Sequence, residues 1–179
     1  ILELSGGTTT FNAGSTVSGA GKLRVSGATV NFNGAANPGA MELNSGTVGG
    51  SGTLTVADWS RSGGTFSMSG SADLTVTGGD FNVNAQYTAT ALTLRAPTGR
   101  IYDNFVGNEV VADTVTLVAS TGIGVGGPAA APSIDLQART GGGTVTVSAS
   151  TASGDIVLTP IDHVSMSAAI AGAGNVSLT

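Results

Sequence analysis

The stretch Ser51-Gly52-Thr53-Leu54-Thr55-Val56 joins a glycine turn to an apolar–polar–apolar triplet. Such triplets recur at Leu2/Leu4, Leu23/Val25, Met41/Leu43, Leu54/Val56, Leu74/Val76, Leu92/Leu94, Val115/Leu117, Ile134/Leu136, Val145/Val147, Ile156/Leu158, Val164/Met166 and Val176/Leu178. Many of the spacings are similar, as from Leu54 to Leu74 and from Leu74 to Leu92. Alternation within each unit and a repeat of about 20 residues are typical of strands stacked as coils of a solenoid.

The composition favours strands and turns. Glycine contributes 29 of 179 residues and proline 5, which together stay below the roughly 25–30% that suggests disorder. Hydrophobic residues make up 40% and aromatic residues only 4%, so the core is expected to be aliphatic. Because Gly, Thr, Ser and Val favour turns and strands over helix, the sequence predicts an all-β protein.

The repeat predicts a right-handed parallel β-helix (a β-solenoid) with about 20 residues per coil, spanning 1–179 as one segment. About nine coils spaced roughly 4.8 Å apart would give a rod on the order of 40 Å long. The middle residue of each triplet should point outward. These outward residues are Glu3, Arg24 and Glu42, then Thr55, Thr75, Thr93 and Thr116. If the first three stack, their charges alternate favourably in sign.

A second ladder is indicated by repeated Phe-Asn pairs. Phe11 and Phe32 lie one repeat apart, each followed by asparagine, and Phe81-Asn82 has the same pair. We therefore expect stacked phenylalanines inside the coils. The segment 101–113 departs from the repeat and predicts a bulged loop, and the segment from Pro128 to Pro132 predicts another loop.

Charge and cysteine content exclude several classes of function. The formal net charge is −5 and no basic run is present, so we expect no nucleic-acid binding. The chain has no cysteine, which excludes disulfides and thiolate metal sites, and no cofactor is expected. No stretch is long and apolar enough to predict membrane insertion. Both ends of the sequence lie in predicted strands, so we expect the segment to be part of a longer exoprotein.

Two phrases in the second half are Val115-Thr116-Leu117-Val118-Ala119-Ser120-Thr121-Gly122-Ile123-Gly124 and Ser133-Ile134-Asp135-Leu136-Gln137-Ala138. They precede Gly154-Asp155-Ile156-Val157-Leu158-Thr159 and Gly174-Asn175-Val176-Ser177-Leu178-Thr179. This order resembles the shaft repeats of filamentous haemagglutinin-like adhesins, exported by two-partner secretion in Gram-negative bacteria. In the first half, Gly21-Lys22-Leu23-Arg24-Val25 and residues 51–56 resemble autotransporter passengers. The resemblance implies a right-handed β-helix within a large exoprotein and supplies no catalytic residue.

Trp59, the only tryptophan, is the candidate for contact with a glycan. Its ring could stack on a sugar, or it could pack over a turn as a corner residue, and the second interpretation is preferred. Tyr87 and Tyr102 are weaker candidates of the same kind.

The polar residues give little support for catalysis or metal binding. His163 follows Asp162, but no nucleophile pairs with them, so a turn histidine is expected. Scattered carboxylates are interpreted as structural, although stacked coils could also form a hydrolase pair or a calcium site. Broken Thr-x-Thr pairs make ice binding a poor alternative.

The sequence thus predicts a structural shaft or adhesive segment of a bacterial secreted or cell-surface adhesin, without catalysis. Its expected partners are surface glycans or proteins, with end-to-end self-association as a further expectation. The alternatives are a polysaccharide-active β-helix enzyme and a self-assembling filament or surface-layer subunit. We expect the protein to be extracellular or on the bacterial cell surface.

Overall fold

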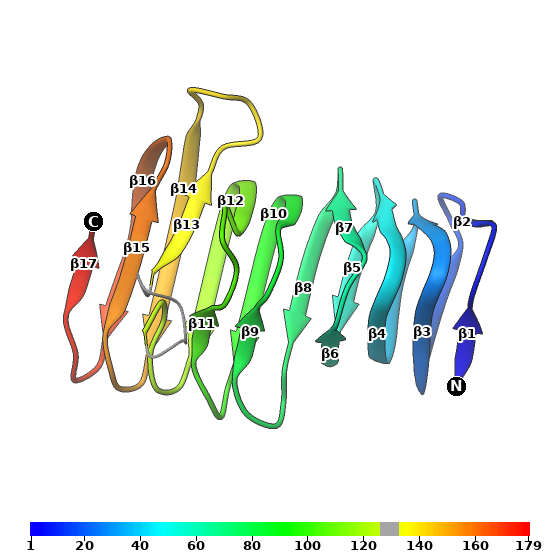
Figure 1. Cartoon of the computed structure of the whole chain (residues 1–179), viewed down its shortest axis with the longest axis horizontal. Coiled ribbons are helices and arrows are strands. Elements are labelled where there is room, and N and C mark those ends of the chain that lie inside the picture. The colour runs from blue at the N-terminus through cyan, green and yellow to red at the C-terminus, as the bar shows by residue number, and fades with distance from the viewer. Residues whose placement is uncertain (126–132) are drawn as a thin grey trace.

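The computed structural model describes residues 1–125 and 133–179, and the predicted loop from Pro128 to Pro132 lies outside the described residues. The protein is all-β, with parallel strands stacked as a solenoid of about eight turns, which confirms the predicted fold class (Figure 1). The strands are β1 (Leu2–Leu4), β2 (Thr8–Phe11), β3 (Thr16–Phe32), β4 (Ala35–Gly50), β5 (Thr53–Val56), β6 (Asp58–Arg61), β7 (Thr65–Met68), β8 (Ser71–Thr75), β9 (Phe81–Val83), β10 (Tyr87–Ala96), β11 (Ile101–Asp103), β12 (Val110–Ala119), β13 (Ile134–Gln137), β14 (Thr144–Thr151), β15 (Ile156–Pro160), β16 (His163–Ala171) and β17 (Val176–Leu178). The described residues contain no helix of the length and hydrophobicity that crossing a membrane requires.

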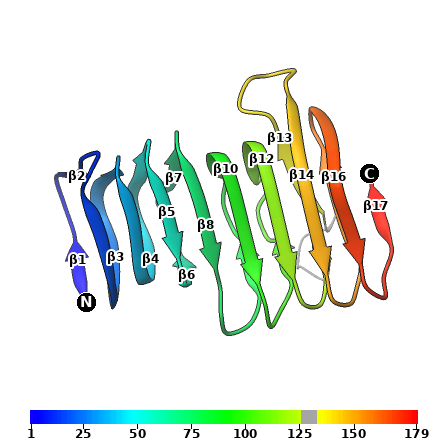
Figure 2. The same cartoon turned by 180° about the vertical axis from the view of Figure 1, so that it is seen from behind.

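Three short strands make up the fourth coil, and they define the faces of the rod. Strands β5, β6 and β7 pair in turn with three successive parts of the long strand β4. We call the face that contains β5 and β8 face A, the face of β6 and β9 face B, and the face of β7 and the start of β10 face C. On face A, β5, β8, β10, β12, β14 and β16 run side by side (Figure 2).

The inward triplets form a continuous aliphatic core. Both apolar members are buried in the triplets that start at Leu23, Met41, Leu54, Leu92, Val115, Ile134, Val145 and Ile156. The rod has about eight turns where nine were expected, because some coils are longer than the expected repeat. On face A, Ala91 pairs with Thr114, and Thr114 pairs with Thr146, which lies much more than one expected repeat further along the chain.

The outward charge ladder has the predicted register on face B. Glu3 pairs with Arg24, which pairs with Glu42, and the Arg24 Nε–Glu42 Oε2 distance is 2.7 Å. Lys22 also donates to Glu42, and together these cations hold the pKa of that carboxyl below its usual value. The predicted threonine column is only partly correct, because Thr55 pairs with Asp73 rather than Thr75. That column lies on face A, so it does not continue the charge ladder.

The phenylalanine ladder forms at two of its three predicted positions. The rings of Phe11 and Phe32 stack with centroids 5.3 Å apart and an interplanar angle of 6°. Phe81 lies instead on face B, where β9 pairs it with Ile101. The expected bulged loop over 101–113 is shorter than predicted, because β11 and the start of β12 occupy both of its ends.

Glycines stacked at one corner allow successive coils to approach closely. Gly34, Gly52 and Gly70 recur at equal intervals along the chain. A Cβ atom added to Gly52 would lie 2.0 Å from the Gly34 carbonyl oxygen, and one added to Gly70 would lie 1.9 Å from that of Gly52. Only glycine fits here, since the obstacle is the backbone of the preceding coil.

Replacing Gly52 with alanine should destabilise the protein by roughly 1–3 kcal/mol, because the methyl group forces the two coils apart. Gly21→Ala is the matched control, because a Cβ there meets nothing within 4 Å. Urea unfolding followed by far-UV circular dichroism measures both variants. Equal midpoints for the two would contradict the close packing at this corner.

Candidate functional site

One strand ladder is interrupted in the middle of face B. Strand β6 pairs with β4, and β9 pairs with β11, but among the described strands no pairing joins β6 to β9. The same two coils are joined on face A by β5 and β8, and on face C by β7 and β10. Because strand edges carry backbone donors and acceptors, the facing edges of β6 and β9 leave such groups unpaired with any strand of residues 1–125 and 133–179.

A change in coil length explains the interruption. From β4 to β8, partners in successive coils are 18 residues apart, as in the pairs Met41–Trp59 and Thr53–Ser71. In the next coil the separation becomes 21 residues, as in the contact of Ser69 with Thr90. The added residues fall in the turn at 76–80, where Gly79 has a φ of +118° that glycine adopts readily. Coils with fewer residues thus meet coils with more residues, and the difference in length separates β6 from β9 on face B.

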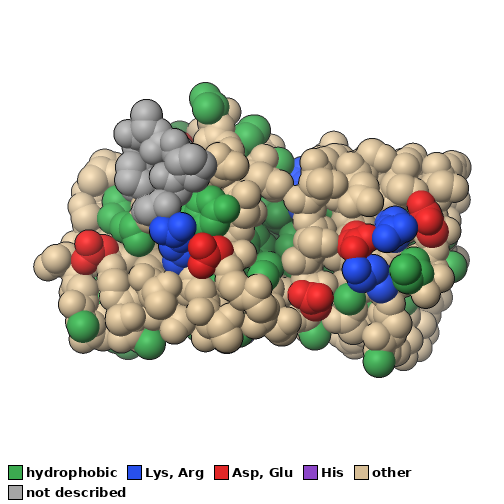
Figure 3. Space-filling model, turned by 60° about the horizontal axis from the view of Figure 1, so that its bottom comes forward, with side chains coloured by type: hydrophobic (Ala, Val, Ile, Leu, Met, Phe, Trp, Pro, Cys, Tyr) green, Lys and Arg blue, Asp and Glu red, His purple; other side chains and the backbone are tan. Residues whose placement is uncertain are grey.

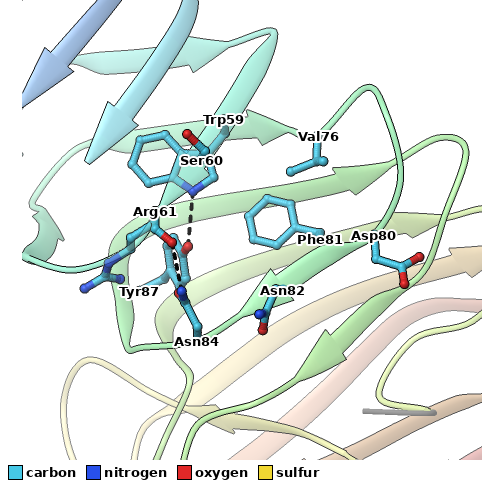
Figure 4. A pocket seen from close by; sticks show the side chains of 9 residues that line it. All are labelled: Trp59, Ser60, Arg61, Val76, Asp80, Phe81, Asn82, Asn84 and Tyr87. Carbon is cyan, nitrogen blue, oxygen red and sulfur yellow. Dashed lines mark hydrogen bonds between the residues drawn. The ribbon is translucent and has the colours of Figure 1, made fainter. Parts of the chain in front are cut away.

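The opening forms a cleft of about 220 Å³. A space-filling view shows a hollow near the middle of this face, with hydrophobic side chains in its floor (Figure 3). The residues that line the cleft come from β6, β9 and the segments beside them, and they are Trp59, Ser60, Arg61, Val76, Asp80, Phe81, Asn82, Asn84 and Tyr87 (Figure 4).

Trp59 lines this cleft but belongs to the core. It is 3% exposed, and its indole N–H donates a 3.1 Å hydrogen bond to the Tyr87 hydroxyl. Its ring packs edge-on against Phe66 at 5.5 Å. The structure therefore places Trp59 inside the coil rather than on the surface, and leaves little of its ring face for a sugar to cover. Tyr87 is fully buried beside it.

Arg61 occupies an inward position that holds an aliphatic residue in the preceding coil, where Leu43 is its partner. Its guanidinium lies 4.8 Å from the Tyr87 ring centroid, in cation–π geometry. Its Nη1 donates to the Gln86 carbonyl at 2.7 Å and its Nη2 to the Gly64 carbonyl at 2.6 Å. Burial lowers the pKa of Arg61 from its ordinary value, and burial raises the pKa of Tyr87.

Two asparagines follow on the β9 side of the cleft. The Asn84 Nδ2 atom donates a 2.8 Å hydrogen bond to the Arg61 carbonyl, which bridges the gap at one end. The Oδ1 atoms of Asn82 and Asn84 are buried and have no hydrogen-bond partner among the described residues. Buried acceptors are normally satisfied, so these two oxygens mark the cleft as a place where a donor is expected.

Three carboxyl groups lie together in later coils. Glu109 is 1% exposed, and its Oε2 accepts a 2.6 Å hydrogen bond from the Asp135 N–H. Burial raises the pKa of Glu109 to about 8, and the neighbouring carboxyls of Asp103 and Asp135 add to the effect. Burial also raises the pKa of Asp103 and of Asp135. Among residues 1–125 and 133–179, no group of three or more such side chains has the arrangement of a metal site.

The other predicted polar residues have structural contacts. Asp162 accepts hydrogen bonds from the backbone N–H groups of Ala138 and Gly142, and its neighbour His163 is exposed at the start of β16. Further carboxylates pair with arginines in adjacent coils, namely Asp73 with Arg95, Asp80 with Arg100 and Asp113 with Arg139. The predicted candidate Tyr102 packs under Arg100, whose guanidinium lies 5.1 Å from the ring.

The sequence interpretation singled out Trp59 but missed the cleft around it. The missed residues are Arg61, Asn82, Asn84 and Phe81. One signal was present, since Trp59-Ser60-Arg61 follows the triplet spacing but ends in a charged residue. Comparisons with family models, curated proteins and solved structures found no match to this chain.

Replacing Tyr87 with phenylalanine should cost about 1–3 kcal/mol of stability, because it leaves the Trp59 N–H buried without an acceptor. Tyr102→Phe is the matched control and should change stability by less than about 0.5 kcal/mol. Equilibrium unfolding in urea, followed through the single tryptophan, measures both variants. A Tyr87→Phe midpoint equal to wild type would show that this hydrogen bond contributes nothing.

Glu109 should make the protein less stable as the pH rises. The unfolded chain loses this proton near the ordinary pKa of 4.5 and the folded chain near a pKa of about 8, so stability should fall across that interval. Glu109→Gln, which carries no titrating proton, should show a smaller fall over the same interval. Thermal melts at several pH values measure the slope, with the exposed Asp58→Asn as control. A steeper or unchanged slope in Glu109→Gln would contradict the assignment.

Proposed function

We propose that this chain is a rigid shaft segment of a bacterial secreted or cell-surface adhesin. The observation that carries the proposal is the unbroken parallel ladder on face A, which runs from β4 through β5, β8, β10, β12 and β14 to β16. Continuous ladders over an aliphatic core make an extended object stiff. A stiff object of this shape is suited to holding a binding surface away from a cell.

Composition supports an extracellular location for the proposed shaft. The chain has no cysteine and only 9% charged residues. A chain with no thiol can cross an oxidising compartment unfolded without forming wrong disulfides. Strand pairing joins each coil only to its neighbours, so folding can proceed coil by coil during export. Surface glycans or proteins are the expected partners of such a segment.

We give less weight to a polysaccharide-active enzyme on the same fold. Its strongest support is the group formed by Asp103, Glu109 and Asp135, since paired carboxyls with separated pKa values perform glycoside hydrolysis. Glu109, whose raised pKa is about 8, is only 1% exposed. A general acid has to come within hydrogen-bond reach of the substrate. In this position the carboxyl accepts a hydrogen bond from the Asp135 N–H of β13 instead.

Stiffness along the rod tests the shaft proposal directly. The chain has no cysteine, so spin labels can be attached to the exposed pair Ala13→Cys and Ala173→Cys without background. Pulsed electron–electron double resonance should give one narrow distance on the order of 30–45 Å, as expected for coils about 4.8 Å apart. The heat-unfolded protein is the control. A broad distribution in the folded state would contradict a rigid shaft.

Adherence tests the biological part of the proposal. The chain is displayed on a non-adherent bacterium, between an outer-membrane anchor and a known binding tag. Surface capture through the tag should exceed that of cells whose tag is joined to the anchor directly. Gly52→Ala is the destabilised comparison, and Gly21→Ala is its matched control. Equal capture with and without the segment would overturn the role as a spacer.

A further inference from the structure

The charged groups of the face B cleft are already neutralised within the protein. Arg61 directs its three donor nitrogens at the carbonyl oxygens of Gly63, Gly64 and Gln86. Asp80 accepts a 3.0 Å hydrogen bond from the Arg100 side chain and another from its backbone N–H. An anionic ligand would therefore find no uncommitted cation among the described residues that line the cleft.

The groups that remain without a partner are neutral acceptors. The Oδ1 atoms of Asn82 and Asn84 are buried, and neither receives a hydrogen bond from the part of the chain that the structure describes. Both asparagines lie on the β9 side of the same cleft. A ligand that satisfies both oxygens has to present neutral donors close together, and neighbouring hydroxyl groups on a ring do this.

The size and floor of the cleft match a compact ring. Its volume of about 220 Å³ lies below the roughly 300–1,000 Å³ of pockets for drug-sized ligands. The rings of Trp59, Phe81 and Tyr87 are almost fully buried, and the small part of them that reaches the cleft makes its floor apolar next to the polar wall (Figure 4). A sugar ring has the same division, with C–H groups on one side and hydroxyls around its edge.

An extended peptide is the main competing ligand, because the facing edges of β6 and β9 lack a strand partner among the described residues. An inserted strand would have to pair along both edges. At one end the Asn84 side chain already binds the Arg61 carbonyl at 2.8 Å, so that edge is closed there. The remaining space therefore favours a compact ligand over an extended one.

We propose that the cleft between β6 and β9 binds one neutral pyranose unit, with the Asn82 and Asn84 carboxamide oxygens accepting hydrogen bonds from its hydroxyl groups. This proposal is independent of the shaft proposal. The spin-label distance measurement tests only the stiffness of the rod and would give the same result whether or not the cleft binds a ligand. The ligand is either a free monosaccharide or one residue of a glycan.

The test is a titration of the ¹⁵N-labelled chain, followed by two-dimensional NMR. Trp59 supplies the only indole N–H signal in the protein, and it lies on the cleft floor. The probes are the methyl glycosides of glucose, galactose and mannose, their neutral disaccharides, methyl glucuronide and an acetylated tetrapeptide. A neutral glycoside should shift the signals of Trp59, Asn82 and Asn84 with a Kd on the order of millimolar. If a disaccharide binds more tightly than the monosaccharide glycosides, the natural ligand is one residue of a glycan rather than a free monosaccharide.

The matched variants are Asn82→Ala in the cleft and Asn12→Ala, whose side chain is exposed in the first coil, away from the cleft. Asn82→Ala should weaken the affinity at least tenfold, while Asn12→Ala should leave it unchanged. Thermal melts test whether both variants are folded. If Asn82→Ala does not fold, Asn84→Ala replaces it as the cleft variant. The proposal is overturned by no shift with any neutral sugar, by equal binding of the glucuronide, by peptide binding alone, or by full affinity in a folded cleft variant.

Discussion

The structure depends on the close approach of one backbone to the next at the corner formed by Gly34, Gly52 and Gly70. A Cβ on Gly52 would lie only 2.0 Å from the oxygen of the coil before it. This contact fixes where each of the shorter coils must turn, and so it sets which residues face each other across the ladders. The pairs Leu43–Arg61 and Met41–Trp59 follow from the same register. Core packing in these shorter coils and the Arg24–Glu42 ion pair have that same spacing.

The candidate site arises where this spacing changes. The shorter coils are followed by longer ones, and the three faces accommodate the difference unequally. Faces A and C keep their hydrogen bonds, while β6 and β9 separate on face B. Trp59, Arg61 and Tyr87 fill the inner part of the separation through one hydrogen bond and one cation–π contact. The cleft is thus a junction between two regular segments rather than an addition to either.

Local alternation made most of the fold predictable from sequence. It identified the inward triplets, the Glu3–Arg24–Glu42 ladder and the Phe11–Phe32 stack, because each depends on one regular register. Thr75 and Phe81 were misassigned for the opposite reason. Their columns depend on the lengths of the turns between strands, and sequence alternation carries no information about those lengths. The cleft was missed for the same cause, because its walls come from coils that only the three-dimensional register brings together.

The interrupted ladder also has a mechanical consequence. At most levels of the rod, tension along its axis is shared by hydrogen bonds between strands on all the faces. At the level of β6 and β9, strand-to-strand hydrogen bonds are found only on faces A and C among the described strands, and face B has the single side-chain bond from Asn84 to the Arg61 carbonyl. Bending that opens face B meets less resistance there than bending toward the other sides. The rod is therefore anisotropic, with a preferred direction of flexure and a defined point of first yield. A sugar seated in the cleft would brace that point, coupling occupancy to the compliance of the rod.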